Sequence, residues 1–431
     1  MNPKADSLSE RRKRVMGHTY RHFFERPLFL VRGEGVWLYD DQGTRYLDCY
    51  NNVPSVGHCH PDVVEALSTQ ASTLNTHTRY LHDAIIEYAE MLAGRLPGEL
   101  SVCTFVCTGT EANDLAYRMA RSVTGNTGAI VTSGAYHGNS TLVSELSPDN
   151  DTVRTGLDFV VEVEPPYTYR SVFPDDQPET ESAYAGLVDD AIEQLRSRGV
   201  LPAMMMIDGI YDAKGILTPG ATYLQQVYEK VRAAGGLIIA DEVQSGLCRL
   251  GDHYWGFEDS GVVPDIVTMG KPMGAGHPLA IVVTTPQIAS EFAKKAHYFN
   301  TFGGNPVSAS VGKAVLEVVE REDILANVKR TGEHFKKGLE ALADKHELIG
   351  DVRGKGLFLG VELVENRSDK KPAKAIAANI VEKMRESGVL ISTTGQFDNV
   401  LKFRPPLVFA REHADLALER LDQSIDAVGQ R

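Results

Sequence analysis

Short apolar runs alternate with longer amphipathic stretches along the chain from about residue 62 to residue 308. The short runs predict buried strands at Val102–Cys107, Ala129–Ser133, Ala203–Ile207, Leu237–Ala240, Ile266–Met269 and Leu279–Val283. The longer stretches predict helices at Asp83–Leu96, Thr110–Arg121, Tyr223–Ala233 and Ile288–Lys295, with a further helix from Pro306 to about Glu322. This alternation is typical of an α/β fold, in which helices connect the strands of a mainly parallel sheet.

The two flanks follow different patterns. Residues 28–48 alternate around the turn Asp40–Gly43, which predicts a small antiparallel meander. Towards the C-terminus, strands are expected at Val361–Val364, Val389–Ser392 and Val400–Phe403. We therefore expect an N-terminal arm and meander over residues 1–60 that packs with the small domain, a large domain over 61–308, and a small α+β domain over 309–431. Residues 147–181 show no clear period and predict a long excursion at the surface or at a subunit contact.

Composition narrows the function classes. The chain has 431 residues and a net charge of -14, which argues against nucleic acid or an anionic membrane surface as a partner. The N-terminus lacks the apolar core of a secretory signal, and no apolar run approaches the ~20 residues of a membrane span. Five scattered cysteines favour free thiols in a reducing compartment, so a cytoplasmic protein is expected.

Lys271 follows a predicted buried strand and precedes a turn that contains Pro272, Gly274 and Gly276. A lysine at a strand end can be held out of bulk water, and burial lowers the pKa of its amine. Such an amine is suited to Schiff-base chemistry. A lysine in a Gly/Pro loop is more often simply solvated, so Lys271 alone does not define a site.

Four further stretches also follow predicted strands, at the edge where open α/β sheets bind ligands. Gly109 and Thr110 lie at the start of a helix whose free N–H groups suit an anion, although this stretch taken alone favours an ordinary capped helix start. Tyr136 lies between glycines and could stack on a planar ring or simply pack in its loop. Asp241 ends a buried strand, where a carboxylate must be paired. Thr301 precedes paired glycines in a second phosphate-like cradle.

One candidate metal motif is weak. His58, Cys59 and His60 lack a second pair of ligands at zinc spacing, so a Gly/Pro-rich connection is favoured and no metal is expected.

The motifs taken together carry a resemblance. In chain order they are GEGVWLYDDQGTRYLD, GHCHP, TGTEAND, AYHG, IADEVQSG, GKPMGAG, FGGNP, RGKGLFLG and KFRPPL. From about Gly33 to the C-terminus the chain resembles the class III aminotransferases, which are fold-type-I enzymes that depend on pyridoxal 5'-phosphate. The resemblance implies that Lys271 binds the cofactor aldehyde and that Asp241 pairs with the ring nitrogen, which keeps the ring able to accept electrons.

The resemblance also implies roles for the remaining motif residues. Val243 would lie under the ring and Tyr136 over it, with His137 of the same AYHG motif in the cofactor site. Gly109 and Thr110 would hold the phosphate, Thr301 would reach it from the partner subunit, and Gln244 would lie near the ring hydroxyl. Sites of this kind form between subunits, so a homodimer, possibly paired into a tetramer, is expected.

Family membership leaves the reaction open between transamination and elimination. Lys402 and Arg404 lie two residues apart and so share one face of a predicted strand. With Arg79, and with Arg21 of the N-terminal arm as a weaker candidate, they would suit a phosphate better than a carboxylate. CYNNVPSVGHCHPDVVEA, VPDIVTMGKPMGAGHP and other stretches resemble the ethanolamine-phosphate and phosphohydroxylysine phospho-lyases. We therefore expect β-elimination of phosphate from O-phosphoethanolamine or a related phosphorylated amine, giving aldehyde, ammonia and phosphate.

Two alternatives remain. An ω-amino or β-amino acid aminotransferase would share every cofactor residue, and a protein that holds the cofactor without turnover would share most of them. One departure from the family pattern bears on the choice. Asp208 stands where relatives usually carry a glutamate that neutralises an arginine of the substrate site, which puts the electrostatics of that site in doubt.

Overall fold

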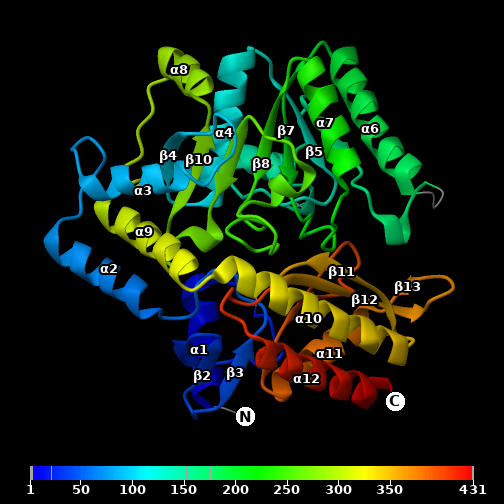
Figure 1. Ribbon diagram of the computed structural model, residues 1–431. Helices are drawn as coiled ribbons and strands as arrows, with labels where there is room; N and C mark the ends of the chain where they lie inside the picture. Colours follow the sequence, from blue (N-terminus) through cyan, green and yellow to red (C-terminus); the bar gives the residue numbers. More distant parts are fainter. Residues whose placement is uncertain (1–2, 21, 151–153, 174–176, 430–431) are drawn as a thin grey trace.

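Seven strands form the central sheet of the computed structural model, which describes residues 3–20, 22–150, 154–173 and 177–429 (Figure 1). Their order is β4-β10-β9-β8-β7-β5-β6. The bounds are β4 Val102–Val106, β5 Gly128–Thr132, β6 Val160–Val163, β7 Pro202–Asp208, β8 Leu237–Asp241, β9 Ile266–Met269 and β10 Ala280–Thr284. β10 runs antiparallel to both β4 and β9, and the other pairs are parallel. The mainly parallel α/β sheet expected from the sequence is confirmed.

Helices cover both faces of this sheet. β7 shows why, because Met204 and Met206 pack with α4 while Met205 and Ile207 pack with α6 and α7. A strand that is buried on both faces must be apolar at every position, which accounts for the unbroken run that predicted it. The helices of this unit are α2 Pro61–Thr73, α3 Asp83–Ala93, α4 Gly109–Thr124, α5 Thr141–Glu145, α6 Gln177–Ser197, α7 Ala221–Ala233, α8 Pro286–Lys295 and α9 Pro306–Arg321.

The interpretation of residues 147–181 as a long excursion at the surface or at a subunit contact was wrong in part. β6 lies inside this range and pairs in parallel with β5 at the edge of the sheet. α6 begins at Gln177 and packs on β5 and β6. A four-residue edge strand is too short to show a period of its own, so its pattern was hidden among polar neighbours.

The C-terminal part forms a smaller α+β unit. Its sheet has the order β11-β12-β16-β15, with β13 attached to β12. The strands are β11 Ile349–Lys355, β12 Phe358–Asn366, β13 Lys371–Pro372, β15 Ser392–Thr394 and β16 Val400–Phe403, and the helices are α10 Ile324–Lys345, α11 Lys374–Glu386 and α12 Arg411–Gly429. Lys402 lies on β16, with Gly360 and Ser392 as its partners on the neighbouring strands.

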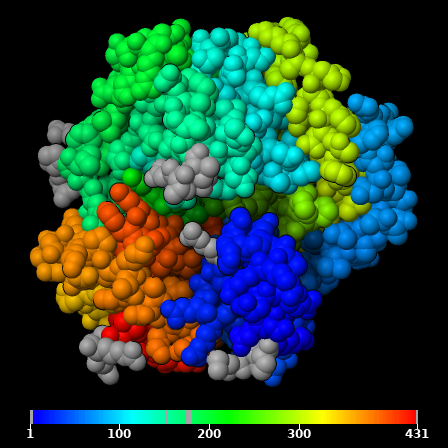
Figure 2. All heavy atoms as spheres, turned by 180° about the vertical axis from the view of Figure 1, so that it is seen from behind, coloured from blue at the N-terminus to red at the C-terminus, as the bar shows by residue number. Residues whose placement is uncertain are grey.

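The N-terminal part follows the predicted meander. α1 Pro3–Met16 precedes β1 Leu30–Glu34, β2 Trp37–Asp40 and β3 Arg45–Asp48. These strands are antiparallel, and β14 Val389–Leu390 joins the sheet in parallel to β3. Figure 2 shows this segment in blue against the orange C-terminal unit. The boundaries at residues 60 and 308 stay predictions.

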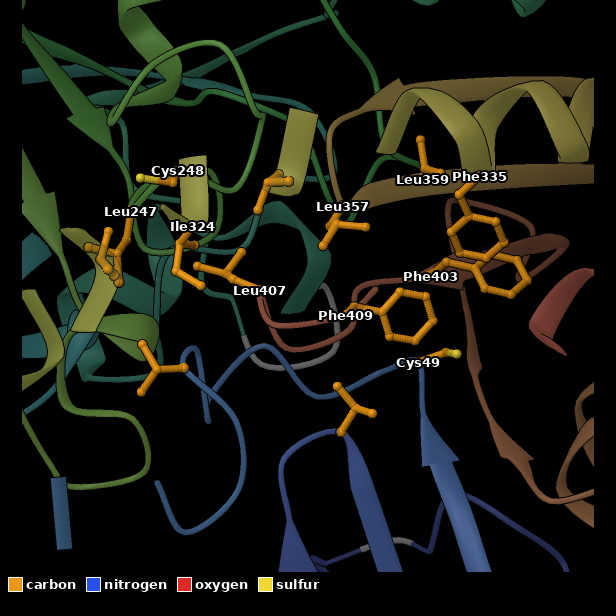
Figure 3. Packing of buried hydrophobic residues seen from close by; sticks show 14 of the residues in the cluster. Cys49, Leu247, Cys248, Ile324, Phe335, Leu357, Leu359, Phe403, Leu407 and Phe409 are labelled. Carbon is orange, nitrogen blue, oxygen red and sulfur yellow. The ribbon is translucent and has the colours of Figure 1, made fainter. Parts of the chain in front are cut away.

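A continuous hydrophobic core joins these parts. Its cluster includes Leu247 and Cys248 after β8, and Phe335, Phe403 and Phe409 from the C-terminal unit (Figure 3). The rings of Phe335 and Phe403 meet edge to face, with 5.3 Å between centroids. This core fixes β16 relative to the loop after β8. Among the described residues, no helix is long and apolar enough to span a membrane.

Candidate active site

A cavity of about 340 Å³ lies at the carboxyl ends of β7, β8 and β9, beside the start of α4. Its size is that of a small-molecule site, and its place is the one where open α/β sheets bind ligands. It is lined by Val53, Cys107, Thr108, Gly109, Thr110, Asn113, Tyr136, His137, Gly138, Asp208, Asp241, Val243, Gln244, Gly270, Lys271, Gly276, His277, Pro278 and Leu279. Seven residues that the sequence assigned to the cofactor site therefore meet Lys271 in one cavity, and Asp208 lines it too.

Lys271 is the first residue of a 3-10 turn, Lys271–Gly274, that follows β9. Pro272 and Met273 after it are buried, so the turn is held in the protein rather than in solvent. Burial lowers the pKa of the Lys271 amine, and the positive charge of Arg404 lowers it further. The environment predicted for this lysine is thus the one that the structure shows.

Asp241 ends β8 and receives a set of donors. Its Oδ2 accepts hydrogen bonds from Asn113 Nδ2 at 2.9 Å and from His137 Nδ1 at 2.8 Å, and its Oδ1 accepts one from the backbone N–H of Val243 at 3.1 Å. Asn113 is in turn held by Thr268, whose hydroxyl donates to Asn113 Oδ1 at 2.7 Å. The carboxylate is therefore fixed in orientation, and Oδ1 keeps a lone pair for one further donor.

Sequence reasoning missed Asn113, which sits in the TGTEAND motif. Asn113 follows Gly109 by four residues, so both lie on the same face of α4. That spacing was a usable signal. His137, which was grouped with the cofactor residues, bonds to Asp241, and its Nε2 is buried without a partner among the described residues.

The start of α4 forms an anion cradle. Thr108 caps the helix by accepting from the Glu111 N–H at 3.1 Å, and Glu111 accepts the N–H groups of Cys107 and Thr108 in return. Within the described chain this leaves the N–H groups of Gly109 and Thr110 without a hydrogen-bond partner. The capped helix start is present, and it directs the two free donors to the cavity, where they would suit an anion.

Gly138 brings a second loop against this cradle. Its φ of +144° is rarely adopted by other residues, and a Cβ at this position would lie 2.5 Å from the hydroxyl oxygen of Thr110. Tyr136, two residues earlier, lines the cavity and is 39% exposed. Val243 lines it as well, and a Cβ added at Gly109 would lie 3.1 Å from Val243 Cγ2. The cavity thus has an aromatic wall, an aliphatic wall and a donor-rich end.

A buried charge cluster adjoins the cavity. Lys402 Nζ lies 3.0 Å from Asp212 Oδ1, and Arg404 Nη1 lies 3.1 Å from Asp212 Oδ2. Gln244 joins this cluster, since its Nε2 donates to Asp212 Oδ2 at 2.9 Å and its Oε1 accepts from Arg404 at 2.6 Å. Asn52 Nδ2 donates to the same Oε1 at 2.9 Å, which fixes the orientation of the Gln244 amide.

Asp212 was not identified from the sequence. It lies beyond β7 in an irregular turn whose preceding residue, Tyr211, has a φ of +47°. Burial alone would raise the pKa of Asp212, but Lys402 and Arg404 outweigh this effect and lower it. Asp212 therefore supplies the negative charge that the sequence pattern assigned to the position of Asp208.

Asp208 instead closes the turn after β7. Its carboxylate accepts the backbone N–H groups of Ile210 at 3.1 Å and Asp212 at 2.9 Å. Burial raises the pKa of Asp208 to about 6, with added repulsion from Asp241 and Asp212. Asp208 therefore holds the turn, and the carboxylate that pairs with Lys402 and Arg404 is that of Asp212, four residues further along the chain.

Arg79 and Thr301, which the sequence also predicted for the site, lie away from the Lys402–Arg404 cluster of the same chain. Arg79 is exposed and places its guanidinium 4.1 Å from the ring centre of Phe299. Thr301, two residues after Phe299, is exposed as well. The structure therefore does not bring Arg79 together with Lys402 and Arg404. Arg21 lies outside the described residues.

The two histidines of the GHCHP motif have separate partners. His58 bonds to Asp48 at 2.7 Å and His60 to Glu322 at 3.1 Å. Their rings are therefore engaged with different elements, as a structural connection requires.

The donor set fits a phosphorylated pyridine aldehyde. The unsatisfied Oδ1 lone pair of Asp241 suits a pyridinium N–H, and the free N–H groups of Gly109 and Thr110 suit a phosphate. The amine of Lys271, with its lowered pKa, suits the aldehyde.

Comparison with known proteins gives the class. The chain matches the Aminotransferase class-III family over residues 17–425, and it belongs to that family. The family is that of pyridoxal 5'-phosphate enzymes, so pyridoxal 5'-phosphate is the cofactor. The fold is the fold-type-I architecture of that class, as expected.

The similar proteins carry names of two kinds. An "Alanine--glyoxylate aminotransferase 2-like" protein of Drosophila melanogaster is 42% identical, over 99% of this chain and 88% of its own length. An "Ethanolamine-phosphate phospho-lyase homolog 1" of Caenorhabditis elegans is 37% identical, over 97% of this chain and 93% of its own. A phospholyase from Arthrobacter, solved in complex with phosphoethanolamine, has a TM-score of 0.94 and 43% identity, covering 97% of this chain and 99% of that one.

Proposed function

We propose that the protein is a phospho-lyase that eliminates phosphate from O-phosphoethanolamine or a related phosphorylated amine. The observation that carries the proposal is the buried pair of cations, Lys402 and Arg404, in the charge cluster that adjoins the Lys271 cavity through Gln244. Both are at most 7% exposed, so an anion bound to them would be shielded from water. Similarity to the Arthrobacter phospholyase supports the same substrate class.

The cofactor supplies an aldehyde that captures the substrate amine and a ring that accepts electrons from the adjacent carbon. Lys271 would hold that aldehyde before substrate arrives and then take the proton from the carbon that bears the amine. Asp241, fixed by Asn113 and His137, would hold a proton on the ring nitrogen. Gly109 and Thr110 would bind the phosphate of the cofactor through their N–H groups.

The remaining residues would position the ring and the substrate. Tyr136 and Val243 would enclose the ring between them. Gln244 has one Nε2 hydrogen beyond the bond to Asp212, and this hydrogen would meet the ring hydroxyl. Lys402 and Arg404 would bind the phosphate of the substrate and draw its oxygen away from the carbon skeleton.

A homodimer is part of this proposal. Exposed apolar side chains surround Arg79 and Thr301, namely Tyr80, Leu81, Phe299 and Phe302, of which Leu81 is 98% exposed. A patch of this kind favours a protein contact. A second copy seated on it would receive Thr301 at its cofactor phosphate and Arg79 at its substrate phosphate, which would restore the three cations expected from the sequence.

A class III aminotransferase is the second candidate, because one observation favours it. Asp212 neutralises one of the two buried cations, and the single net positive charge that remains would also suit a substrate carboxylate. The aminotransferase names of some relatives agree with this alternative.

The two functions separate in an assay without an amine acceptor. We would incubate the holoenzyme with O-phosphoethanolamine, with longer phosphorylated amines and with ethanolamine, and measure inorganic phosphate and aldehyde. The lyase releases both in equal amounts, through many turnovers, from phosphorylated amines alone. An aminotransferase stops after one turnover and releases no phosphate.

A further inference from the structure

We propose that Lys402 is the acid that protonates the departing phosphate, and that Asp212 is the positioning residue that keeps Lys402 charged. This inference rests on the proposed phospho-lyase function and deepens it. Elimination of a phosphate dianion needs a proton at the oxygen that leaves, since the unprotonated trianion is a poor leaving group. Lys271 is committed to taking the carbon-bound proton, so a separate donor is required.

Lys402 is the group that the structure places for this task. It is 7% exposed, and its amine is held at 3.0 and 3.3 Å from the two oxygens of Asp212. Asp212 also accepts a hydrogen bond from Gln244, which lines the cavity together with Lys271, so the cluster that contains Lys402 adjoins that cavity. Arg404 shares Asp212 but cannot act in the same way, because a guanidinium does not give up its proton in a protein.

The electrostatics explain why Asp212 is needed. Burial lowers the pKa of Lys402, and the charges of Arg404 and Lys271 lower it further, whereas Asp212 raises it. The phenol ring of Tyr50 lies 5.7 Å from the amine, and the strand neighbours Gly360 and Ser392 carry no charge. Asp212 is thus the counter-charge that allows a buried lysine to keep its proton until the substrate arrives.

The elimination breaks one C–H bond and one C–O bond. The electron pair of the broken C–H bond forms the new carbon–carbon double bond, and Lys271 receives the proton. The electron pair of the broken C–O bond leaves with the phosphate oxygen, and the proton from Lys402 Nζ converts the departing group to hydrogen phosphate. Lys402 is left neutral beside Asp212 and regains its proton from solvent when phosphate leaves.

The test compares two leaving groups in the holoenzyme. Lys402→Arg keeps the positive charge but has no proton to give, so kcat for O-phosphoethanolamine should fall by about 100-fold or more. Elimination of chloride from 2-chloroethylamine needs no proton, so its kcat/KM should change by less than about threefold. Equal losses for both substrates, or an unchanged kcat for phosphate, would overturn the proposal.

Binding of inorganic phosphate, measured by calorimetry, gives a readout that does not depend on turnover. Lys402→Arg should keep the wild-type affinity within about threefold, whereas Lys402→Met should weaken it by about tenfold or more. In Asp212→Asn the affinity should begin to fall at lower pH than in the wild type, because Lys402 loses its proton earlier. The same pH dependence in both proteins would remove the role assigned to Asp212.

Tyr50→Phe is the matched control, since a phenol next to the same cations is the other candidate donor. Burial raises the pKa of Tyr50, which makes it the weaker acid. A selective loss of phosphate elimination in Tyr50→Phe, with Lys402→Arg unaffected, would transfer the role to Tyr50. If the wild-type enzyme released no phosphate at all, the proposed function itself would fail, which is a different result from any of these.

Discussion

Asp208 and Asp241 are direct partners in the register of β7 and β8, so two buried carboxylates end adjacent parallel strands. Asp241 accepts from Asn113, His137 and Val243, whereas the donors to the Asp208 carboxylate within the described residues are the backbone N–H groups of its own turn. The strand ends therefore carry one carboxylate directed to cofactor chemistry and one that stabilises the turn leading to Asp212.

The first prediction concerns the pH dependence of stability. Asp208 has a folded-state pKa of about 6 against 3.8 for a free side chain. A raised folded pKa contributes stability that is fully present below about pH 4 and is lost as the pH rises through about 6. Asp208→Asn should therefore gain stability relative to the wild type over that window, on the order of 3 kcal/mol. Denaturant unfolding of both proteins without cofactor, from pH 4.5 to 8, measures this, and parallel curves would contradict it.

A second prediction concerns the hydrogen bonds from Thr268 through Asn113 that hold the Asp241 carboxylate. Asn113→Ala removes a donor from Asp241 and leaves the buried Thr268 hydroxyl without its acceptor, at a cost of about 1–3 kcal/mol in the free energy of unfolding. Its affinity for pyridoxal 5'-phosphate should also fall. Thr268→Val breaks the same chain of hydrogen bonds without touching Asp241, so it should lose stability but keep the cofactor affinity. Equal cofactor affinities in the two variants would show that Asn113 acts only on stability.

A third prediction uses the close approach at Gly138. A Cβ at this position would clash with Thr110 and would strain a backbone that L residues rarely adopt. Gly138→Ala should therefore displace the cradle and weaken cofactor binding by about tenfold or more, as measured by titration of the absorbance of the bound cofactor. Gly186→Ala is the control, because nothing lies within 4 Å of its added Cβ. Comparable cofactor affinities would refute the claim that the contact between Gly138 and Thr110 holds the anion cradle in place.

A fourth prediction tests whether sites are shared between subunits. Lys271→Ala should abolish both turnover and the visible absorption of the bound aldehyde, and Arg79→Ala should impair phosphate binding. If Arg79 serves the partner's site, mixed dimers of the two variants contain one complete site and should regain about a quarter of wild-type activity after random reassembly. Mixtures that stay as inactive as the parent variants would place Arg79 in its own chain's site or outside both.

The sequence predicted the parts of the molecule that obey a period or a motif. Strand β7, which is covered by helices on both faces, was predicted from its unbroken apolar run. The residues of the cofactor cavity were predicted because they follow the ends of predicted strands. Asp212 could not be found in this way, since it lies in a turn whose direction depends on the left-handed backbone of Tyr211. β6 was missed because four residues at a sheet edge do not reveal a period. Arg79 could not be placed from the sequence, because it lies in an exposed loop between α2 and α3, away from Lys402 and Arg404 of its own chain.

The most direct test of phospho-lyase activity gives the holoenzyme a phosphorylated amine and an amine acceptor at the same time. With O-phosphoethanolamine and pyruvate present together, a phospho-lyase should accumulate inorganic phosphate and acetaldehyde in equal amounts and should form no alanine. Formation of alanine without release of phosphate would contradict it.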